Sequence, residues 1–312
     1  MKTALVTGGA GFIGSNLVGA LVADDVTVRV LDDLSTGYAA NLESLPEVDL
    51  VEGSVTDATA VGNAVRECDA VFHLAASVGN KRSIDNPLFD ATTNMLGTLT
   101  VLEAAREHGV RKVVYSSSAG IFGELKTLPI AEDHLLDPGS PYGVSKLAGE
   151  KAVLAYAKLY DLEGVALRYF NVYGPNQRFD QYGNVIPIFV FQMLCGEPIT
   201  VFGDGEQTRD FINVADVVQA NVKAALAEGV GGAFNIASGT RISINYLVAR
   251  LAELIGGEVE IRYGEPRPGD VLHSLADVSA ARKILGFDPE VDIAGGLAEY
   301  VAWARDEVSQ SR

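Results

Sequence analysis

The sequence has little cysteine, little histidine and a shortage of basic residues. It contains 2 cysteines, Cys68 and Cys195, and 4 histidines, and none of them falls in a CxxC or His/Cys metal-binding spacing. Two distant cysteines do not make a disulfide framework, so we expect a reducing, cytoplasmic setting and no bound metal. The 24 Lys and Arg residues are outnumbered by 41 Asp and Glu residues, a net charge of −17. Such a chain is a poor partner for nucleic acid or an anionic membrane, because both attract clustered basic residues.

Long hydrophobic runs are also missing. No apolar stretch approaches the ~18 residues that a membrane-spanning helix needs. The first residues, MKTALVTGGAGFIG, hold only a short apolar run that leads straight into a glycine-rich turn. We therefore expect a first strand at the N-terminus, neither a signal peptide nor a membrane anchor.

The first half of the chain alternates short apolar runs with longer amphipathic segments. Brief Val-, Leu- and Ala-rich runs are typical of strands buried on both faces. We predict strands at Thr3–Thr7, Thr27–Asp32, Asp49–Glu52, Ala70–Ala75, Lys112–Ser116 and Val165–Tyr169. Helices are expected between them, for example at Ile13–Ala23, Thr59–Glu67 and Asn94–Glu107. This alternation predicts an α/β protein with a doubly wound, Rossmann-type parallel sheet.

The pattern changes after Tyr169, where NVYGPNQRFDQYGNVIP is rich in turn-forming residues. A helix near residues 214–227 and a strand at Ala233–Ile236 are expected to rejoin the sheet. We predict a Rossmann domain of residues 1–170 plus about 207–238. A smaller, interleaved α/β substrate domain would comprise about 171–206 plus 239–312.

The stretch VTGGAGFIGSNL has glycines at 8, 11 and 14, directly after a predicted strand and at the start of a predicted helix. Gly8 and Gly11 would let the backbone turn tightly and approach a pyrophosphate, and Gly14 would let helix and sheet pack closely. The helix N-terminus offers unpaired N–H groups to the phosphates. The alternative is a purely structural turn, but the strand–turn–helix context favours dinucleotide binding.

An acidic residue at the end of the next strand indicates which dinucleotide binds. Asp32 lies close to the ~20-residue spacing expected of the carboxylate that binds the NAD ribose. A carboxylate there repels the extra phosphate of NADP, so we predict NAD. Asp33 is a weaker candidate for the same role, and a solvated carboxylate at a strand end is the alternative.

Tyr142 and Lys146 lie four residues apart in GSPYGVSKLAGEK. Ser140 and Pro141 read as a helix N-cap and first helical residue, so both side chains share one helix face. A tyrosine with an ordinary pKa near 10 must lose roughly 3 units to act as a base near neutrality. A neighbouring ammonium and an oxidised nicotinamide both favour the phenolate. A tyrosine and a lysine at this spacing are common in ordinary helices. The nucleotide loop and the serines at 116–118 favour the catalytic interpretation over that alternative.

The motifs TGGAGFIG, SSSA, YGVSK, RYFNVYGPNQ, GDGEQTRDF and PRPGD together resemble the extended short-chain dehydrogenase/reductase superfamily. More narrowly, they are similar to nucleotide-sugar epimerases of the UDP-galactose 4-epimerase type. The resemblance implies that Tyr142 is the base, that Lys146 is its partner and a ribose ligand, and that Ser118 holds the 4-oxygen of the sugar, with Ser117 as the alternative. It also implies cofactor contacts at Phe12, Ile13, Ser54, Val55, Leu74, Ala75, Ala76, Asn94, Ser116 and Tyr169.

The residues after the serine discriminate between reactions of this superfamily. Its 4,6-dehydratases have an Asp-Glu pair there and its UDP-glucuronate decarboxylases have a Glu, whereas this chain has Ala119 and Gly120. A general acid or base is worth about 10²–10⁴-fold in rate, so elimination would lose its catalyst. The resemblance therefore implies transient oxidation at carbon 4 by NAD, rotation of the 4-keto sugar, and reduction on its other face.

The resemblance also implies a UDP-sugar site. Its expected residues are Asn171, Asn184, Val185, Thr200, Phe202, Arg209, Arg267, Asp270 and Ser274. Arg209 and Arg267 suit phosphate oxygens, with surface salt bridges as the alternative. Phe202 is either a uracil wall or a core residue. Ser274 replaces a tyrosine of enterobacterial enzymes and leaves room for an N-acetyl group.

Two further positions bear on specificity. Arg178 stands where UDP-glucuronate epimerases place an arginine for the carboxylate; a solvent-facing arginine or a phosphate contact is the alternative. Ser54 replaces the family's aspartate that reads the adenine amino group, which weakens the expected adenine contact.

We predict an NAD-dependent UDP-hexose 4-epimerase that forms a homodimer through a four-helix bundle. Its substrate would be UDP-glucose and UDP-galactose, or their N-acetylated or uronate forms. A nucleotide-sugar 4-ketoreductase or dehydrogenase is the enzymatic alternative, and an NAD-sensing regulator is the non-enzymatic one.

Overall fold

A computed structural model describes residues 1–180, 183–257, 259–266 and 271–310. Within these ranges, a central sheet of seven parallel strands has the order β11-β6-β5-β4-β1-β2-β3. The strands are β1 (Thr3–Thr7), β2 (Thr27–Asp32), β3 (Asp49–Glu52), β4 (Ala70–His73), β5 (Lys112–Ser118), β6 (Glu163–Tyr169) and β11 (Gly232–Ile236). The order reverses direction at β1 and β4, which creates the crevice where such sheets bind ligands.

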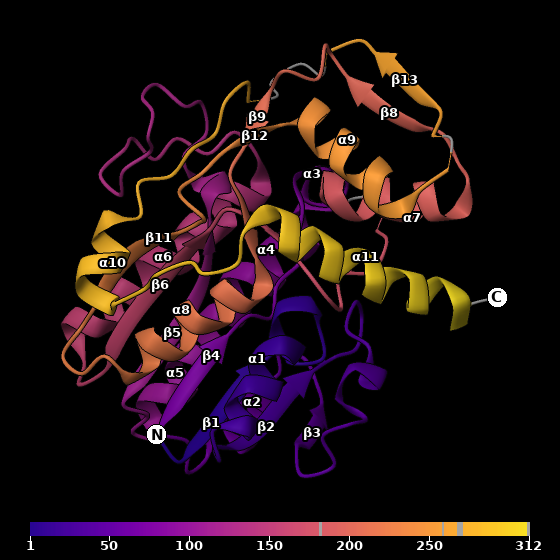
Figure 1. Ribbon diagram of the computed structural model, residues 1–312. Coiled ribbons are helices and arrows are strands. Elements are labelled where there is room, and N and C mark those ends of the chain that lie inside the picture. The colour runs from indigo at the N-terminus through magenta and orange to yellow at the C-terminus, as the bar shows by residue number, and fades with distance from the viewer. Residues whose placement is uncertain (181–182, 258, 267–270, 311–312) are drawn as a thin grey trace.

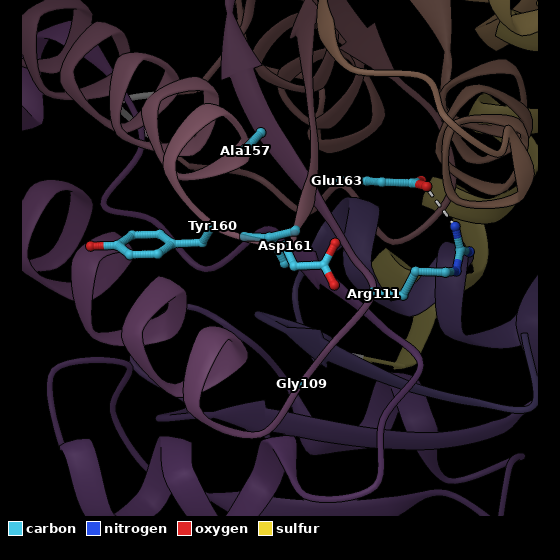
Figure 2. A pocket seen from close by; sticks show the side chains of 7 residues that line it. Gly109, Arg111, Ala157, Tyr160, Asp161 and Glu163 are labelled. Atoms are coloured by element: carbon cyan, nitrogen blue, oxygen red, sulfur yellow. Dashed lines mark hydrogen bonds and ion pairs between the residues drawn. The ribbon is translucent and has the colours of Figure 1, made fainter.

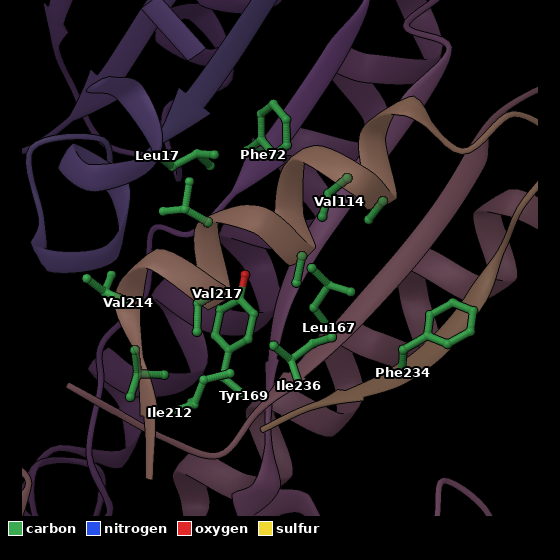
Figure 3. Packing of buried hydrophobic residues seen from close by; sticks show 14 of the residues in the cluster. Leu17, Phe72, Val114, Leu167, Tyr169, Ile212, Val214, Val217, Phe234 and Ile236 are labelled. Atoms are coloured by element: carbon green, nitrogen blue, oxygen red, sulfur yellow. The ribbon is translucent and has the colours of Figure 1, made fainter. Parts of the chain in front are cut away.

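Helices cover both faces of the sheet, as Figure 1 shows. Helices α1 (Phe12–Ala23) and α8 (Val214–Leu226) pack on one face, and α2 (Ala58–Val65), α5 (Gly97–Glu107) and α6 (Pro141–Leu159) pack on the other. Successive strand residues point to opposite faces, so Val6 and Leu5 belong to different hydrophobic cores. The first of these cores is seen in Figure 3, where Leu17 of α1 lies near Phe72 of the sheet and Val217 of α8 lies beside Tyr169.

Short elements connect the larger ones on the cofactor side. They are η1 (Ala39–Leu42), α3 (Asn80–Asp85), α4 (Pro87–Ala91), a π-helix η2 (Thr92–Leu96) and η3 (Ala119–Ile121). The single α-helix predicted from Asn94 is wrong at its start, because α5 begins only at Gly97 after the π-helical turn. Such turns are frequent at functional sites.

The rest of the chain forms a smaller part with its own hydrophobic core around Phe189, Leu247 and Tyr300. Its elements are β7 (Asn171–Tyr173), α7 (Val185–Cys195), β8 (Ile199–Phe202), β9 (Thr208–Arg209), β10 (Phe211–Asn213), β12 (Ile242–Ser243), α9 (Ile244–Ile255), β13 (Ile261–Gly264) and α11 (Ile293–Gln310). Helix α10 (Ser279–Leu285) packs instead against β11 and α8 of the larger part. Helix α11 packs against α7 and α9.

The predicted fold class is confirmed, and three of the six predicted strands in the first half have the predicted bounds. The strand predicted at Ala233–Ile236 does rejoin the sheet, as β11 beside β6. The domain boundaries stay a prediction. In the described part of the chain, no helix combines the length and apolar character needed to cross a bilayer.

Candidate functional site

The predicted cofactor and catalytic residues meet at one edge of the sheet. Gly8, Asp32 and Leu74 lie at or just beyond the carboxyl ends of β1, β2 and β4, and Ser118 ends β5. Because these strands are parallel, their carboxyl ends share the same edge. This is the edge at which doubly wound sheets bind dinucleotides.

The glycine loop forms a cradle that side chains would block. Gly8 has φ +71°, and a Cβ added there would lie 2.7 Å from the backbone nitrogen of Ala75. A Cβ on Gly14 would lie 2.1 Å from the carbonyl oxygen of Gly8. Helix α1 follows with Gly11 as its N-cap and no capping side chain, so the first-turn N–H groups at Phe12, Ile13 and Gly14 face the loop. These residues fit a bound pyrophosphate.

Asp32 is held in place for a ribose. It is 7% exposed; one carboxylate oxygen accepts a hydrogen bond from Ala10 N (2.9 Å) and the other from Leu34 N (2.9 Å). Each oxygen keeps a further lone pair for a hydroxyl group. Burial raises the pKa of Asp32, and the two backbone hydrogen bonds oppose that rise. Asp33, by contrast, is exposed and accepts a hydrogen bond from Ser35 N (3.0 Å).

The predicted acid/base pair lies at the start of α6. Ser140 caps this helix by accepting a hydrogen bond from Gly143 N (3.1 Å), and Pro141 is its first residue, as predicted. Tyr142 hydrogen-bonds with Ser118, whose Oγ also accepts a hydrogen bond from Gly120 N (3.1 Å). Since Gly120 N donates to that oxygen, the hydroxyl proton of Ser118 is available to Tyr142 or to a substrate oxygen.

Lys146 lies one turn further along α6 and is 2% exposed. Its Nζ is 4.8 Å from the centre of the Tyr115 ring, a cation–π arrangement. The nearest acidic influence is Asp90 of α4, which is 1% exposed. Asp90 accepts a hydrogen bond from Asn94 Nδ2 (3.0 Å) through one oxygen, and its other oxygen is buried without a partner among the described residues. The motif-based analysis missed Asp90, although it precedes Asn94 by one helical turn.

Burial dominates the proton affinities of this cluster. It raises the pKa of Tyr142 to about 12, and the hydrogen bond with Ser118 opposes the rise. It lowers the pKa of Lys146 to about 7, and the charge of Asp90 opposes that fall. Burial also lowers the pKa of His73, beneath Lys146 in the sheet, to about 3, so this imidazole is neutral. The depressed tyrosine pKa expected from the sequence is therefore not a property of the protein alone, because burial and the charge of Asp90 raise the pKa of Tyr142 and the hydrogen bond with Ser118 only partly opposes them.

The structure separates the two candidate serines. Ser117 is 1% exposed and donates a hydrogen bond to Glu150 Oε2 (2.8 Å), which also pairs with Arg168. Ser118 is the serine next to Tyr142. The hydroxyl of Ser117 is thus engaged in a buried ion pair, and Ser118 alone of the two faces the predicted base.

Two residues predicted to contact the cofactor, Asn94 and Tyr169, have side chains that hydrogen-bond within the protein. Asn94 donates hydrogen bonds to Asp90, to the Ser77 carbonyl (2.9 Å) and to Ser145 Oγ (3.0 Å), and accepts one from Ser77 N (2.8 Å). Its side chain therefore braces α6 from within, and a cofactor contact at Asn94 stays a prediction. The Tyr169 side chain packs in the core shown in Figure 3, and its hydroxyl donates to Asn221 Oδ1 (2.9 Å).

Other predicted cofactor residues lie around the same crevice. Ser54 follows β3, and its Oγ is 2.9 Å from Thr56 Oγ1, so it is partly engaged in its own turn. Val55 is buried, while Leu74, Ala75 and Ala76 form the segment after β4. Ser116 hydrogen-bonds with Tyr169.

The structure does not support a sugar-carboxylate role for Arg178. Its Nε pairs with Glu307 Oε1 (3.0 Å) and its Nη1 donates to Asn41 Oδ1 (2.7 Å). The guanidinium also lies 4.3 Å from the centre of the Tyr38 ring. These partners belong to α11 and to the loop after β2, at the cofactor-ribose end. A carboxylate of the protein thus already neutralises this arginine, and its role toward a sugar carboxylate stays a prediction.

The predicted substrate residues gather in the smaller part of the molecule. Asn171 donates to the carbonyl of Asp210 (2.9 Å), and both Arg209 and the backbone of Ser274 hydrogen-bond the carbonyl of Thr208 (3.0 Å each). Asn184 and Val185 begin α7, and Thr200 and Phe202 lie on β8. Arg267 and Asp270 lie outside the described residues. Among the described residues, no group of three or more His, Cys, Asp or Glu could hold a metal ion.

The hollow in Figure 2 is a different place. It has a volume of about 320 Å³ and is lined by Arg111 and Glu163, which pair at 3.0 Å, and by the loops before β5 and β6. It therefore lies at the amino ends of the strands, opposite the edge that holds Gly8 and Ser118.

Comparison with known proteins agrees with this geometry. Residues 4–237 match the NAD dependent epimerase/dehydratase family. A UDP-glucose 4-epimerase of Mycolicibacterium smegmatis is 42% identical over 98% of this chain and 99% of its own length. A Thermotoga maritima UDP-glucose 4-epimerase solved with UDP-glucose has a TM-score of 0.94, with 38% identity over 98% of this chain and 99% of the other. A UDP-N-acetylglucosamine 4-epimerase from Methanobrevibacter ruminantium, in complex with UDP-N-acetylmuramic acid, has a TM-score of 0.93, with 36% identity over 99% of both chains. The chain therefore belongs to the NAD-dependent epimerase/dehydratase family.

Proposed function

We propose that the protein interconverts UDP-hexoses at carbon 4, using bound NAD. One observation carries the choice of reaction within a family that contains both epimerases and dehydratases. Tyr142 is paired with Ser118, while the next two residues, Ala119 and Gly120, provide no second acid or base beside the reacting carbon. The pair can take a proton from one hydroxyl and give it back, and nothing next to it promotes elimination.

The residues of this chain have distinct tasks in that reaction. NAD, when bound, would supply the hydride chemistry at carbon 4. Gly8, Gly14 and Asp32 hold the pyrophosphate and ribose. Ser118 orients the 4-hydroxyl, and Tyr142 removes its proton and restores it after the sugar has turned. The positive charge of NAD, when bound, would favour the phenolate of Tyr142, which burial alone does not.

Several sugars remain candidates for the substrate. Ser274 is small and 7% exposed, and its size favours a pocket with room for an N-acetyl group. The engagement of Arg178 by Glu307 disfavours a uronate. We therefore propose UDP-glucose, UDP-galactose and their N-acetylamino analogues as substrates, and expect UDP-glucuronate to be a poorer substrate than these.

The test uses purified protein incubated with UDP-glucose, UDP-N-acetylglucosamine or UDP-glucuronate, with no added cofactor. NMR should detect the carbon-4 epimer of at least one of the first two. A product that forms only when NADH or NAD is supplied stoichiometrically would instead indicate the ketoreductase or dehydrogenase alternative. A dehydrated sugar would contradict the argument from Ala119 and Gly120.

We also propose the homodimer and the cytoplasmic setting expected from the sequence. Large apolar side chains are exposed along the adjoining helices α4, η2, α5 and α6, namely Leu88, Phe89, Leu96, Leu99 and Val144. A second copy of the chain that pairs these helices would cover this surface. Light scattering that gives a monomer would contradict the dimer. Both Cys68 and Cys195 are free thiols, which suits a reducing compartment.

A further inference from the structure

The segment 174–180, which we call the strap, leaves β7 and contacts the cofactor side of the molecule at several points. Asn16 Nδ2 of α1 donates to the Pro175 carbonyl (3.0 Å), and Asn176 Nδ2 donates to Ser15 Oγ (3.0 Å). Further along, Asp180 pairs with Arg82 of α3 (2.6 Å). The strap therefore spans from the helix that follows the glycine loop to the helix that follows β4.

Arg178 anchors the middle of the strap. Its Nε pairs with Glu307 of α11, and its Nη1 donates to Asn41 of η1. The guanidinium lies over the Tyr38 ring at 4.3 Å and near the Trp303 ring at 5.9 Å. The side chains of Arg178 and Glu307 are 20% and 21% exposed, so the pair is largely shielded from water. A planar guanidinium can satisfy an ion pair, an amide acceptor and an aromatic face at once, which an ammonium cannot.

Asn41 connects this anchor to the ribose site. Its Nδ2 donates to the carbonyl of Ala10 (2.9 Å), and Tyr38 N donates to the same carbonyl (3.0 Å). The amide N–H of Ala10 in turn donates to Asp32 Oδ2 (2.9 Å). A continuous series of contacts thus runs from α11 through Arg178 and Asn41 to the carboxylate expected to bind the ribose.

We propose that Arg178 is a positioning residue that holds the strap over the ribose end of the cofactor site and thereby slows the release of NAD. The inference rests on the proposed function, because an epimerase regenerates NAD in every cycle and gains nothing from releasing it. Opening the site at this end requires the ion pair to Glu307 and the hydrogen bond to Asn41 to separate together. Retention of the cofactor is thereby coupled to the docking of the C-terminal helix.

The experiment measures NAD dissociation from the intact holoenzyme. After dilution into excess apoenzyme as a trap, Arg178→Ala should lose its nucleotide on the order of tenfold or more faster than the unmodified protein, which corresponds to about 1.4 kcal/mol. With saturating NAD, its kcat should stay within about threefold of the unmodified value, since Arg178 touches neither Tyr142 nor Ser118. Arg178→Lys, which keeps the charge, should restore part of the retention.

Two further variants make the result specific. Glu307→Gln removes the same ion pair from the other side and should also speed NAD release. Arg262→Ala removes an arginine of equal charge on β13 from an exposed pair with Glu260, which precedes that strand, and its NAD release should match that of the unmodified protein. Circular dichroism and melting temperature establish that each variant is folded, and Glu307→Gln keeps the test decisive if Arg178→Ala does not fold.

Three outcomes would overturn the proposal. The first is NAD release from Arg178→Ala and Glu307→Gln at the rate of the Arg262→Ala control. The second is a selective loss of UDP-glucuronate turnover while NAD retention is unchanged, which would indicate that Arg178 binds the sugar carboxylate. The third is faster release that Arg178→Lys does not slow at all. Bound nucleotide is measured without substrate, so a failure to epimerise any UDP-sugar would count against the proposed function and leave this comparison intact.

Discussion

Residues 142, 146 and 150 follow one another at four-residue spacing on α6, yet the two ends of this face differ sharply. At its far end, Glu150 is fully buried and saturated with partners. It accepts hydrogen bonds from Ser117 and, through both oxygens, from Arg168 at 2.7 and 3.0 Å. At the near end, the ammonium of Lys146 faces the Tyr115 ring at 4.8 Å, and Asp90, whose charge acts on it, has an oxygen with no hydrogen-bond partner among the described residues.

The difference distinguishes a buried ion pair that stabilises the fold from buried groups that can exchange protons in a reaction. A buried ion pair with complete hydrogen bonds is fixed in one protonation state and one geometry. Incompletely satisfied groups are held at higher energy, and burial moves the pKa of Tyr142 up and that of Lys146 down toward neutrality. Such groups change their proton occupancy when a nearby charge changes, which a proton-transfer site requires.

The largest expected effect comes from removing the phenol at the near end. Tyr142→Phe keeps the ring but deletes the phenol that is placed next to Ser118 to take the proton, so we expect kcat to fall by about 10²–10⁴-fold. Bound NAD and the melting temperature should stay near those of the unmodified protein. A variant that keeps more than about a tenth of the activity would contradict the role of Tyr142.

At the far end, the expected effect is on stability. Arg168→Leu leaves the carboxylate of Glu150 buried with Ser117 as its main partner, and losing one member of a buried pair costs about 3–5 kcal/mol. Denaturant unfolding should report that loss, while kcat of the folded fraction changes little. The double variant Arg168→Leu/Glu150→Leu should recover much of the stability. A cost below about 1 kcal/mol, typical of an exposed pair such as Arg262–Glu260, would mean that water solvates this cluster.

Local patterns in the sequence were enough to predict the strands, the glycine loop, Asp32 and the start of α6, because neighbours in the chain dictate each of them. The roles of Ser117 and Ser118 could not be separated in that way, since only the positions of Glu150 and Tyr142 decide them. The pairing of Arg178 with Glu307 could not be predicted either, because Glu307 lies 129 residues away in the chain. Contacts of this kind depend on how helices pack, and no short motif records them.

The smallest effect should come from Asp90, whose charge acts on Lys146 and whose Oδ1 accepts a hydrogen bond from Asn94 that an asparagine could also accept. Burial holds the pKa of Lys146 at about 7, and the carboxylate of Asp90 raises it. Asp90→Asn removes that charge, so the pKa of Lys146 falls and the ammonium loses its proton at lower pH. The alkaline limb of the kcat/KM profile should therefore move to lower pH, with a loss on the order of several-fold near neutrality, because each unit of pKa changes the charged fraction about tenfold above it. Asp85→Asn, at an exposed carboxylate paired with Lys81, should leave the profile unchanged. A limb that moves to higher pH would show that the carboxylate of Asp90 does not stabilise the charge on Lys146.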